Sequence, residues 1–246
     1  MFITIDNNII EKLSRTELAV IRFINENKNR LSKLSIVDIA CETFCSPATV
    51  SRAIRKCGLN GFNELRYKLA LEDKDNITYS TVEVLNKSLI EAQRVIEQIS
   101  LESLENIKNK LMSSIRIYII ARGLTSHVAE EFMFKLELLD FNAFSIVDPN
   151  VMKIKSNNMK KDENLFIFSL NGKTQELITS AKNANLCGAN VITCCCNKDS
   201  ELLSLSDNYI VGYKHNHNSI STYEVASRVS LHIISRIIID YITMYK

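Results

Sequence analysis

The sequence predicts an all-α N-terminal helix-turn-helix domain followed by an α/β domain, whose doubly wound parallel sheet has a flavodoxin-like three-layer arrangement. Three observations predict this organisation. Short capped amphipathic stretches fill the first part of the chain, and short apolar runs alternate with helical stretches in the second. A polar, acidic segment at 73–78 separates the two. We therefore expect domains at 1–75 and 101–246, joined by a linker helix within 76–100.

Composition narrows the class of protein further. The 246 residues are 46% hydrophobic and 24% charged, with a net charge of +2, so bulk charge indicates no particular partner. No apolar run approaches the roughly 20 residues of a membrane span. The N-terminus lacks the features of a signal peptide, and seven Cys in no paired framework suit a reducing compartment. These features favour a cytoplasmic protein.

Capping residues mark the first helices. Ser14 and Glu17 form the capping box that opens a helix running to residue 25. The side chains that this helix is expected to bury include Leu18, Ile21, Phe23 and Ile24. A second, short helix over 36–42 begins at Ser32 or Ser35, since either can act as its N-cap.

A third helix completes the helix-turn-helix. Ser46 is a good N-cap and Pro47 suits the first helical position, which predicts a helix over 47–56 that Gly58 ends. A fourth helix over 63–71 follows Gly61-Phe62. Two short helices joined by a tight turn are typical of DNA-binding proteins, in which the second helix enters the major groove.

The two faces of the third helix differ in chemistry. Val50, Ile54 and Cys57 share the apolar face, with Ala53 beside them. The opposite face offers guanidinium groups for base edges or phosphates and small residues that permit close approach. The candidate DNA-binding residues are Ala48, Thr49, Ser51, Arg52, Arg55 and Lys56. The alternative is a solvated outer face of a small helical domain. Local charge favours DNA, because the basic residues between 45 and 70 are Arg52, Arg55, Lys56, Arg66 and Lys68 against Glu64 alone.

Two strand–turn–helix units in the second half carry hydroxyl groups at their turns. An apolar strand over 116–121 runs into the turn 122–126, and another over 164–168 runs into the loop 169–174, which reads Ser-Leu-Asn-Gly-Lys-Thr. Such turns expose the first N–H groups of the following helix and can bind an anion. The candidate ligand-binding residues are Thr125, Ser126, Ser169, Asn171, Gly172 and Thr174. The alternative is an ordinary βα turn with Thr174 as an N-cap.

The remaining elements fit the same α/β pattern. Helices are expected over 79–99, over 101–112 after Ser100, and over 127–139, 174–185 and 221–241. Further strands are expected over 142–146, 190–193 and 209–211, with a turn at 148–150. The last helix is more apolar than one sheet layer covers, which indicates a dimer interface.

Cysteine and histidine residues suggest a metal site only weakly. Cys194, Cys195 and Cys196 close a strand, so neighbouring side chains point to opposite faces and cannot surround one tetrahedral ion. Buried or half-buried thiols explain them better. His127 and His232 lie in helical context and fit core or surface positions. We expect no metal and no cofactor.

Both halves of the chain resemble known families. Residues 121–125 and 169–174 resemble the Gly-x-Gly-x-Ser and Ser-x-Ser-Gly-x-Thr turns of the sugar isomerase (SIS) domain, with Ala121, Thr125 and Asn171 as substitutes. The resemblance covers roughly residues 100–246. The Ala-Thr-Val-Ser-Arg run at 48–52 and the Gly-Leu-Asn-Gly-Phe turn at 58–62 resemble the N-terminal domain of RpiR-family bacterial regulators, which join it to a C-terminal SIS domain.

The resemblance implies a DNA-binding transcriptional regulator of carbohydrate metabolism. Its partners would be operator DNA and a sugar phosphate held in the SIS domain, and it would act as a homodimer or homotetramer. In SIS domains, residues that enter the last helix approach the sugar phosphate, which makes Ser221 and Glu224 candidates and leaves the role of Arg228 open.

Two other classes of function compete with this interpretation. An SIS-type aldose–ketose isomerase would need a base, for which His127, Glu130 or Glu224 could serve, but no spacing singles one out. A scaffold that binds no nucleic acid would have no use for Arg52 and Arg55 opposite a buried face.

Overall fold

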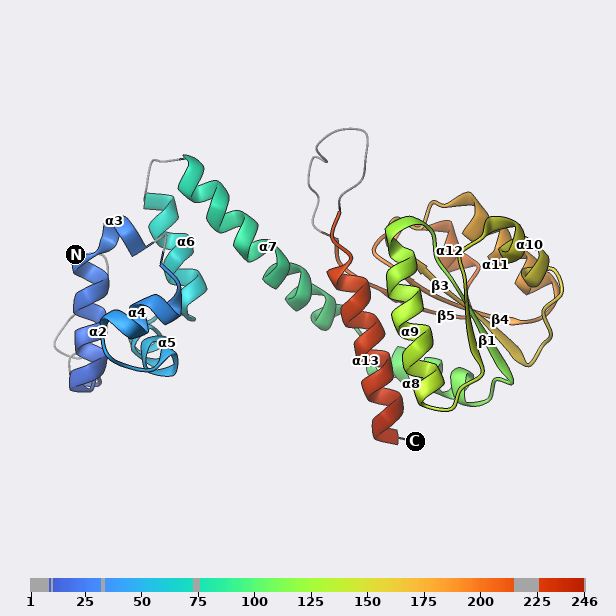
Figure 1. The fold of residues 1–246 in the computed structure, drawn as a ribbon, viewed down its shortest axis with the longest axis horizontal. Coiled ribbons are helices and arrows are strands. Elements are labelled where there is room, and N and C mark those ends of the chain that lie inside the picture. The colour runs from blue at the N-terminus through green and yellow to red at the C-terminus, as the bar shows by residue number, and fades with distance from the viewer. Residues whose placement is uncertain (1–8, 10, 32–33, 73–75, 215–225, 246) are drawn as a thin grey trace. The chain divides into compact units, whose positions relative to one another are not determined.

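The computed structural model describes residues 9, 11–31, 34–72, 76–214 and 226–245. The chain divides into two compact units, Met1–Ser88 and Leu89–Lys246. Helix α7 (Asn76–Gln98) crosses this division. Figure 1 shows a helical first unit and a second unit in which helices cover a central sheet. None of the helices in the described ranges is long and apolar enough to cross a membrane.

The first unit confirms the predicted helix-turn-helix. Its helices are α2 (Arg15–Glu26), α3 (Lys28–Leu31), α4 (Ile36–Glu42), α5 (Pro47–Lys56) and α6 (Phe62–Glu72). Ser14 caps α2 through the predicted capping box, Ser35 caps α4, and Ser46 caps α5, whereas Ser32 lies outside the described residues. These caps satisfy N–H groups that would otherwise lack partners, so the local sequence fixes where each helix begins.

A single apolar core holds these helices together. Val20, Ile21 and Ile24 of α2 pack with Val50 and Ile54 of α5, and all five side chains are fully buried. The prediction for α2 was wrong at two positions, because Leu18 and Phe23 are only half-buried. The buried face of α2 is formed by Glu17, Val20, Ile21 and Ile24, and Leu18 and Phe23 lie at its two edges.

The second unit confirms the predicted three-layer α/β fold. In the described part of this unit, five parallel strands lie in the order β2-β1-β3-β4-β5. Their bounds are β1 Arg116–Ile120, β2 Ala143–Ile146, β3 Glu163–Ser169, β4 Asn190–Cys195 and β5 Asn208–Val211. The register is regular, with Ile120 of β1 beside Ile146 of β2 and Ile167 of β3. This strand order is that of flavodoxin-like sheets.

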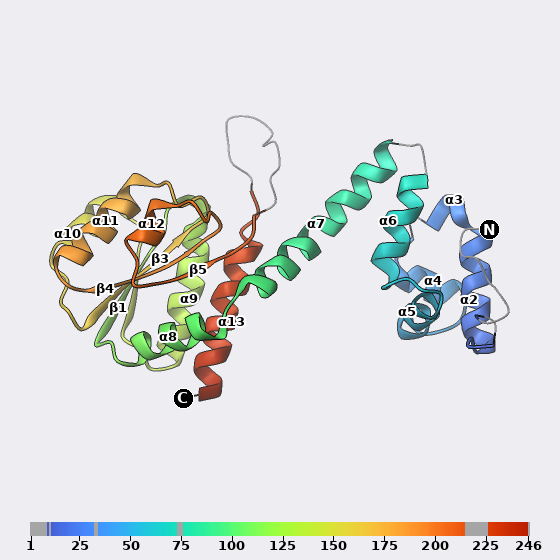
Figure 2. The ribbon, with the colours of Figure 1, turned by 180° about the vertical axis from the view of Figure 1, so that it is seen from behind.

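Helices cover both faces of this sheet. Helices α8 (Leu101–Met112), α9 (Ser126–Leu138) and α13 (Val229–Tyr245) pack on one face, against Phe166 and Phe168 of β3. Helices α10 (Pro149–Ser156), α11 (Gln175–Leu186) and α12 (Glu201–Ser204) pack on the other, against Leu165 and Ile167. Figure 2 shows the two helical layers on opposite sides of the strands. Alternate residues of one buried strand therefore supply both cores.

Some predicted boundaries were wrong. Asp148 does not mark a simple turn: its carboxylate accepts the N–H groups of Asn150 and Val151 and caps α10. Helix α7 begins three residues before the predicted start, and α12 was not predicted. Residues 226–228 are not helical, although the last helix was predicted to begin at 221, and 221–225 lie outside the described residues. The hydroxyl of Ser227 accepts the N–H of Val229, so a local side-chain bond satisfies this N–H where α13 begins.

Candidate functional site

The strand order creates a crevice between β1 and β3. After β1 the chain enters α9 on one face of the sheet, and after β3 it enters α11 on the other. The two connections diverge at their shared carboxyl edge, which is where open α/β sheets bind ligands. The first connection includes a short 3-10 turn, Gly123–Thr125. The loops predicted from sequence thus lie side by side at this edge.

A cavity of about 260 Å³ occupies the crevice. Its lining comes from both loops, from the end of β3 and from the approach to α13. The lining residues are Arg122, Gly123, Thr125, Phe168, Ser169, Leu170, Asn171, Thr174, Leu177 and Arg228. A second, more open hollow of about 480 Å³ shares Asn171 and Thr174 with it. The structure therefore brings together Thr125, Ser169, Asn171 and Thr174 at one cavity.

The loop after β3 is built around Gly172. The N–H of Gly172 donates to Ser169 Oγ at 3.1 Å, and its carbonyl oxygen accepts from Ser200 Oγ at 2.8 Å. Gly172 has a φ of +65°, a left-handed conformation that favours glycine. It is buried and does not line the cavity, so its contribution is to hold the turn that carries Asn171.

The threonine hydroxyls at the two helix starts are not used for capping. Thr174 precedes α11 and Thr125 precedes α9, and neither side chain makes a capping hydrogen bond. Thr174 does occupy the N-cap position of α11, as the alternative interpretation expected, but its side chain makes no capping hydrogen bond. Ser126 differs, because its hydroxyl donates to the carbonyl of Gly123 at 2.9 Å and the residue does not line the cavity. Two hydroxyls, rather than three, are presented to the cavity by these helix starts.

Two guanidinium groups give the cavity a positive character. Arg122 donates to the carbonyl of Val147 at 2.9 Å and lies 3.7 Å from the Glu176 carboxylate. Arg228 donates to the carbonyl of Ala226, and within the described part of the chain its buried Nε has no hydrogen-bond partner. Helix starts and guanidinium groups both favour an anionic ligand.

Sequence reasoning missed several lining residues. Arg122 lies in the first loop, and its position directly after a strand could have identified it as a lining residue. Asn197 follows β4 and Lys214 follows β5, yet both reach Asn171. Asn197 Nδ2 donates to the Asn171 carbonyl at 3.0 Å, and Lys214 Nζ donates to Asn171 Oδ1 at 2.7 Å. Because all parallel strands end at one edge, residues distant in sequence meet there. Glu224 and Ser221 lie outside the described residues.

The three consecutive cysteines pack inside the second unit. Cys194 and Cys195 are buried, and Cys196 is half-buried beside the second hollow. Burial raises the pKa of the Cys196 thiol to about 12, so it is protonated near neutral pH. Among the described residues, no three or more His, Cys, Asp or Glu side chains form a group that could hold a metal ion.

The candidate histidines lie on the surface. His232 Nδ1 lies 3.0 Å from Glu131 Oε2, and His127 lies 3.9 Å from Glu130. Both imidazoles are exposed, and neither lines the cavity between β1 and β3.

Helix α5, the second helix of the helix-turn-helix, presents a polar outer face. Thr49 accepts from Arg52 at 3.3 Å, and its hydroxyl lies 3.0 Å from the Ser46 hydroxyl, so Arg52 is oriented toward the start of the helix. Arg52 and Arg55 are exposed, as is Ala48, whereas Ser51 is half-buried. The N-terminal part of this helix therefore offers a guanidinium held by a neighbouring hydroxyl.

Three of the basic residues counted between 45 and 70 also have partners within the first unit. Lys56 Nζ lies 2.7 Å from the Glu17 carboxylate and 2.9 Å from the Lys12 carbonyl. Arg66 donates to the Leu34 carbonyl at 2.5 Å, and Lys68 pairs with Glu64 at 2.9 Å. Arg52 and Arg55 differ from these three, because among the described residues neither forms an ion pair or a hydrogen bond outside α5.

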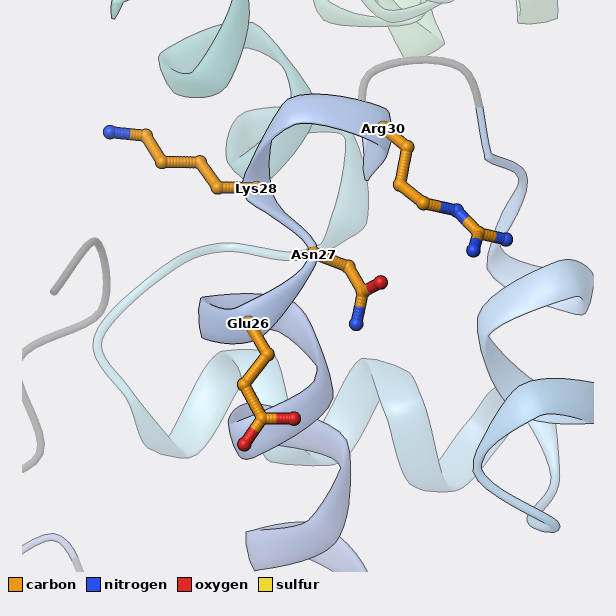
Figure 3. Close-up of a pocket in the computed structure, with 4 residues that line it drawn as sticks. All are labelled: Glu26, Asn27, Lys28 and Arg30. Atoms are coloured by element: carbon orange, nitrogen blue, oxygen red, sulfur yellow. The ribbon is translucent and has the colours of Figure 1, made fainter.

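A separate hollow lies near the end of α2 but lacks the features of a site. It is lined by Glu26, Asn27, Lys28 and Arg30. Figure 3 shows that Lys28 and Arg30 extend in opposite directions while Glu26 points away from both. Their polar groups do not converge, so this hollow offers no common binding point.

Comparisons with known proteins agree with both units. A family model described as the helix-turn-helix domain of the rpiR family matches residues 4–76, and the SIS domain model matches residues 110–230. An uncharacterized HTH-type transcriptional regulator of Clostridium perfringens is 26% identical over 89% of this chain and 83% of its own length. One of Caldanaerobacter subterraneus is 24% identical over 72% and 68%.

Solved structures share the fold. The NanR protein of Vibrio vulnificus, solved in complex with ManNAc-6P, superposes with a TM-score of 0.62 at 23% identity, covering 97% of this chain and 89% of that one. The sugar isomerase domain of an RpiR transcription factor from Sphaerobacter thermophilus gives 0.62 at 13% identity, covering 67% and 90%. A helix-turn-helix unit followed by a SIS domain defines a class of transcriptional regulators. This chain belongs to the RpiR family within that class.

Proposed function

We propose that this regulator binds a sugar phosphate in the cavity between β1 and β3 and that the ligand alters its affinity for operator DNA. Thr125, Ser169, Asn171 and Thr174 would hold the phosphate, while Ser126 and Gly172 would shape the two loops. Glu224 remains a candidate for the sugar hydroxyls. The ligand need only bind two conformations unequally to shift the DNA-binding equilibrium.

One observation carries this proposal. Two helix starts whose threonine hydroxyls are not used for capping converge on a cavity that also contains Arg122 and Arg228. Unpaired N–H groups at helix starts, hydroxyls and guanidinium groups are the donors that bind phosphate. NanR, of the same fold, was solved with ManNAc-6P, which supports the same ligand class here.

The DNA-binding surface is proposed on α5. Arg52 and Arg55 would contact base edges or phosphates, with Ala48, Thr49 and Ser51 close to the groove. Lys56 would act mainly by clamping α5 to α2 through Glu17. We also propose the division into a DNA-binding segment 1–75, a connecting segment 76–100 and a sensor segment 101–246. The active form would be a homodimer or homotetramer in the cytoplasm, where its operator is accessible.

An isomerase remains the competing function, and it would need a base at the cavity. The described lining of the two adjoining cavities includes no carboxylate and no imidazole that could act as a base. A binding role needs only the donors that are present. Incubation with sugar phosphates followed by analysis for the isomeric sugar would distinguish catalysis from binding.

The proposal is tested with the purified full chain. A thermal-shift panel of hexose, amino-sugar and pentose phosphates would include ManNAc-6P and inorganic phosphate. A ligand at a hundredfold excess over its Kd stabilises the folded state by about 2.7 kcal/mol. A raised melting temperature with one sugar phosphate, clearly smaller in a Thr174→Val variant, supports the assignment. No shift with any compound in the panel contradicts it.

A further inference from the structure

The outward face of α2 carries a self-complementary pattern. Buried residues of α2 centre on one side of the helix, and on the opposite side lie Arg15, Ala19, Arg22 and Glu26, all exposed. Half-buried Leu18 and Phe23 flank this row. These six residues line an open hollow of about 490 Å³. Hereafter they are called the α2 outer face.

The charges of this face are not paired with one another or with other described residues. Within the described residues, Arg15, Arg22 and Glu26 form no ion pair, whereas nearby Arg30 pairs with Glu42 at 3.4 Å. The two ends of the α2 outer face thus carry opposite charges, with arginine at the start and glutamate at the end. Leu18, Ala19 and Phe23 lie between these ends together with Arg22, an arrangement suited to an antiparallel helix partner.

Phe44 adds an aromatic side chain beside the same hollow. It is 95% exposed, and its φ of +50° is an outlier for a bulky residue. It lines the hollow together with Leu18 and Phe23. A strained, almost fully exposed phenylalanine next to half-buried apolar residues indicates a surface that is covered in the assembled protein.

We propose that the α2 outer face pairs antiparallel with the α2 outer face of a second copy of this chain. A two-fold axis between residues 20 and 21 places Arg15 opposite Glu26 of the partner subunit. The same axis places Leu18 opposite Phe23 of the partner subunit, and Ala19 opposite Arg22 of the partner subunit. Each contact occurs twice, as an isologous interface requires.

Charge complementarity selects a second copy over an unrelated protein. In the antiparallel arrangement both ion pairs join opposite charges, and the small side chain of Ala19 leaves room for the stem of Arg22 of the partner subunit. A parallel arrangement would place Arg15 opposite Arg15 of the partner subunit and is disfavoured by repulsion. The contact joins the DNA-binding units directly and is separate from any association of the SIS domains.

The first experiment is a zero-length crosslink on the full-length Arg15→Lys variant. A carbodiimide joins a lysine amine to a carboxylate with which it is in contact. Residues 15 and 26 lie about 16 Å apart along one helix, so a Lys–Glu link between these positions must join two copies. We expect a dimer band whose digest contains this linked peptide, and we expect its loss in Arg15→Lys/Glu26→Gln. A dimer band without this peptide overturns the proposal.

A second experiment reverses the charges of the proposed ion pair in two variants, both of which are expected to fold. Arg15→Glu and Glu26→Arg each change an exposed residue. Two copies of the same variant should repel each other, because they place like charges opposite one another. Mixed in equal amounts, however, the two variants form both ion pairs across one interface. Native mass spectrometry of the mixture should give a heterodimer fraction well above one half, whereas differently tagged wild-type copies give the statistical half. A statistical fraction in the variant mixture, or monomers only, overturns the proposal.

Discussion

A Cβ atom added to Gly172 would lie 2.1 Å from the Oγ of Ser200. Because Ser200 Oγ also donates to the Gly172 carbonyl at 2.8 Å, the two residues fix the loop that carries Asn171 and Thr174. The contact ties the loop after β3 to the start of α12, so the geometry of the proposed ligand site depends on a residue that does not line it.

Gly172→Ala should therefore impair both stability and ligand binding. We expect a loss of about 1–3 kcal/mol in unfolding free energy from overpacking, and a weaker affinity for the effector. Gly188→Ala is the matched control, since Gly188 also has a positive φ of +74° but meets only the flexible side chain of Lys161. Urea unfolding and calorimetric titration measure the two effects. Equal losses in both variants would show that the contact with Ser200 is unimportant.

Thr174→Val should separate binding from folding. The Thr174 hydroxyl makes no capping bond, so its removal should change the unfolding free energy by less than about 0.5 kcal/mol. The loss of a donor to phosphate should weaken effector binding about tenfold, or about 1.4 kcal/mol. Thr179→Val makes the same change within α11, away from the cavity, and should leave affinity intact. A Thr174→Val protein with wild-type affinity removes Thr174 from the site.

Lys56→Met should loosen α5 from α2. The side chain of Glu17 is only 6% exposed, so removal of the ammonium leaves a nearly buried carboxylate without its main partner. The expected cost is about 1–3 kcal/mol, read from hydrogen exchange of the α2 and α5 amides. Arg30→Met breaks the exposed pair with Glu42 and should cost less than about 1 kcal/mol. Similar protection in both variants would contradict the clamping role.

Acid should destabilise the first unit through the same carboxylate. The hydrogen bond from Lys56, followed by that from the Ser14 N–H, holds the pKa of Glu17 below its ordinary value of 4.5. A depressed pKa in the folded state contributes stability above the unfolded-state value, and this contribution disappears as the pH falls through the folded-state pKa. Urea midpoints should therefore fall below about pH 4.5. Glu17→Gln should reduce this dependence, and an unchanged dependence would assign it to other groups.

Arg52→Ala should weaken operator binding and leave effector binding unchanged. Loss of a bidentate base contact costs about 1–3 kcal/mol, or roughly ten- to a hundredfold in affinity. Arg30→Ala removes an exposed arginine from the same unit but not from the outer face of α5, and serves as the control. Fluorescence anisotropy with operator DNA and calorimetry with the effector report the two activities. Unchanged DNA affinity in Arg52→Ala would remove α5 from the proposed interface.

Local sequence determined the elements and most of their boundaries. Ser14, Ser46 and Ser100 cap helices as predicted, because a cap depends on residues within one turn of it. Alternating apolar runs and helices were sufficient to predict the parallel sheet and its three layers. The boundary errors at Asp148 and Ser227 arose where a side chain satisfies backbone N–H groups in a way that resembles an ordinary loop.

Tertiary structure decided which residues share a site. Sequence identified the hydroxyl-bearing loops and the outer face of α5, but it could not show that Asn197 and Lys214 reach Asn171 from other strand ends. Nor could it show that Lys56 pairs with Glu17, since the two are 39 positions apart. Local propensity acts over a few residues, whereas side-chain contacts depend on how distant elements pack. The sequence by itself therefore determined the class of protein, and packing determined the composition of its cavity and the charge of its outer faces.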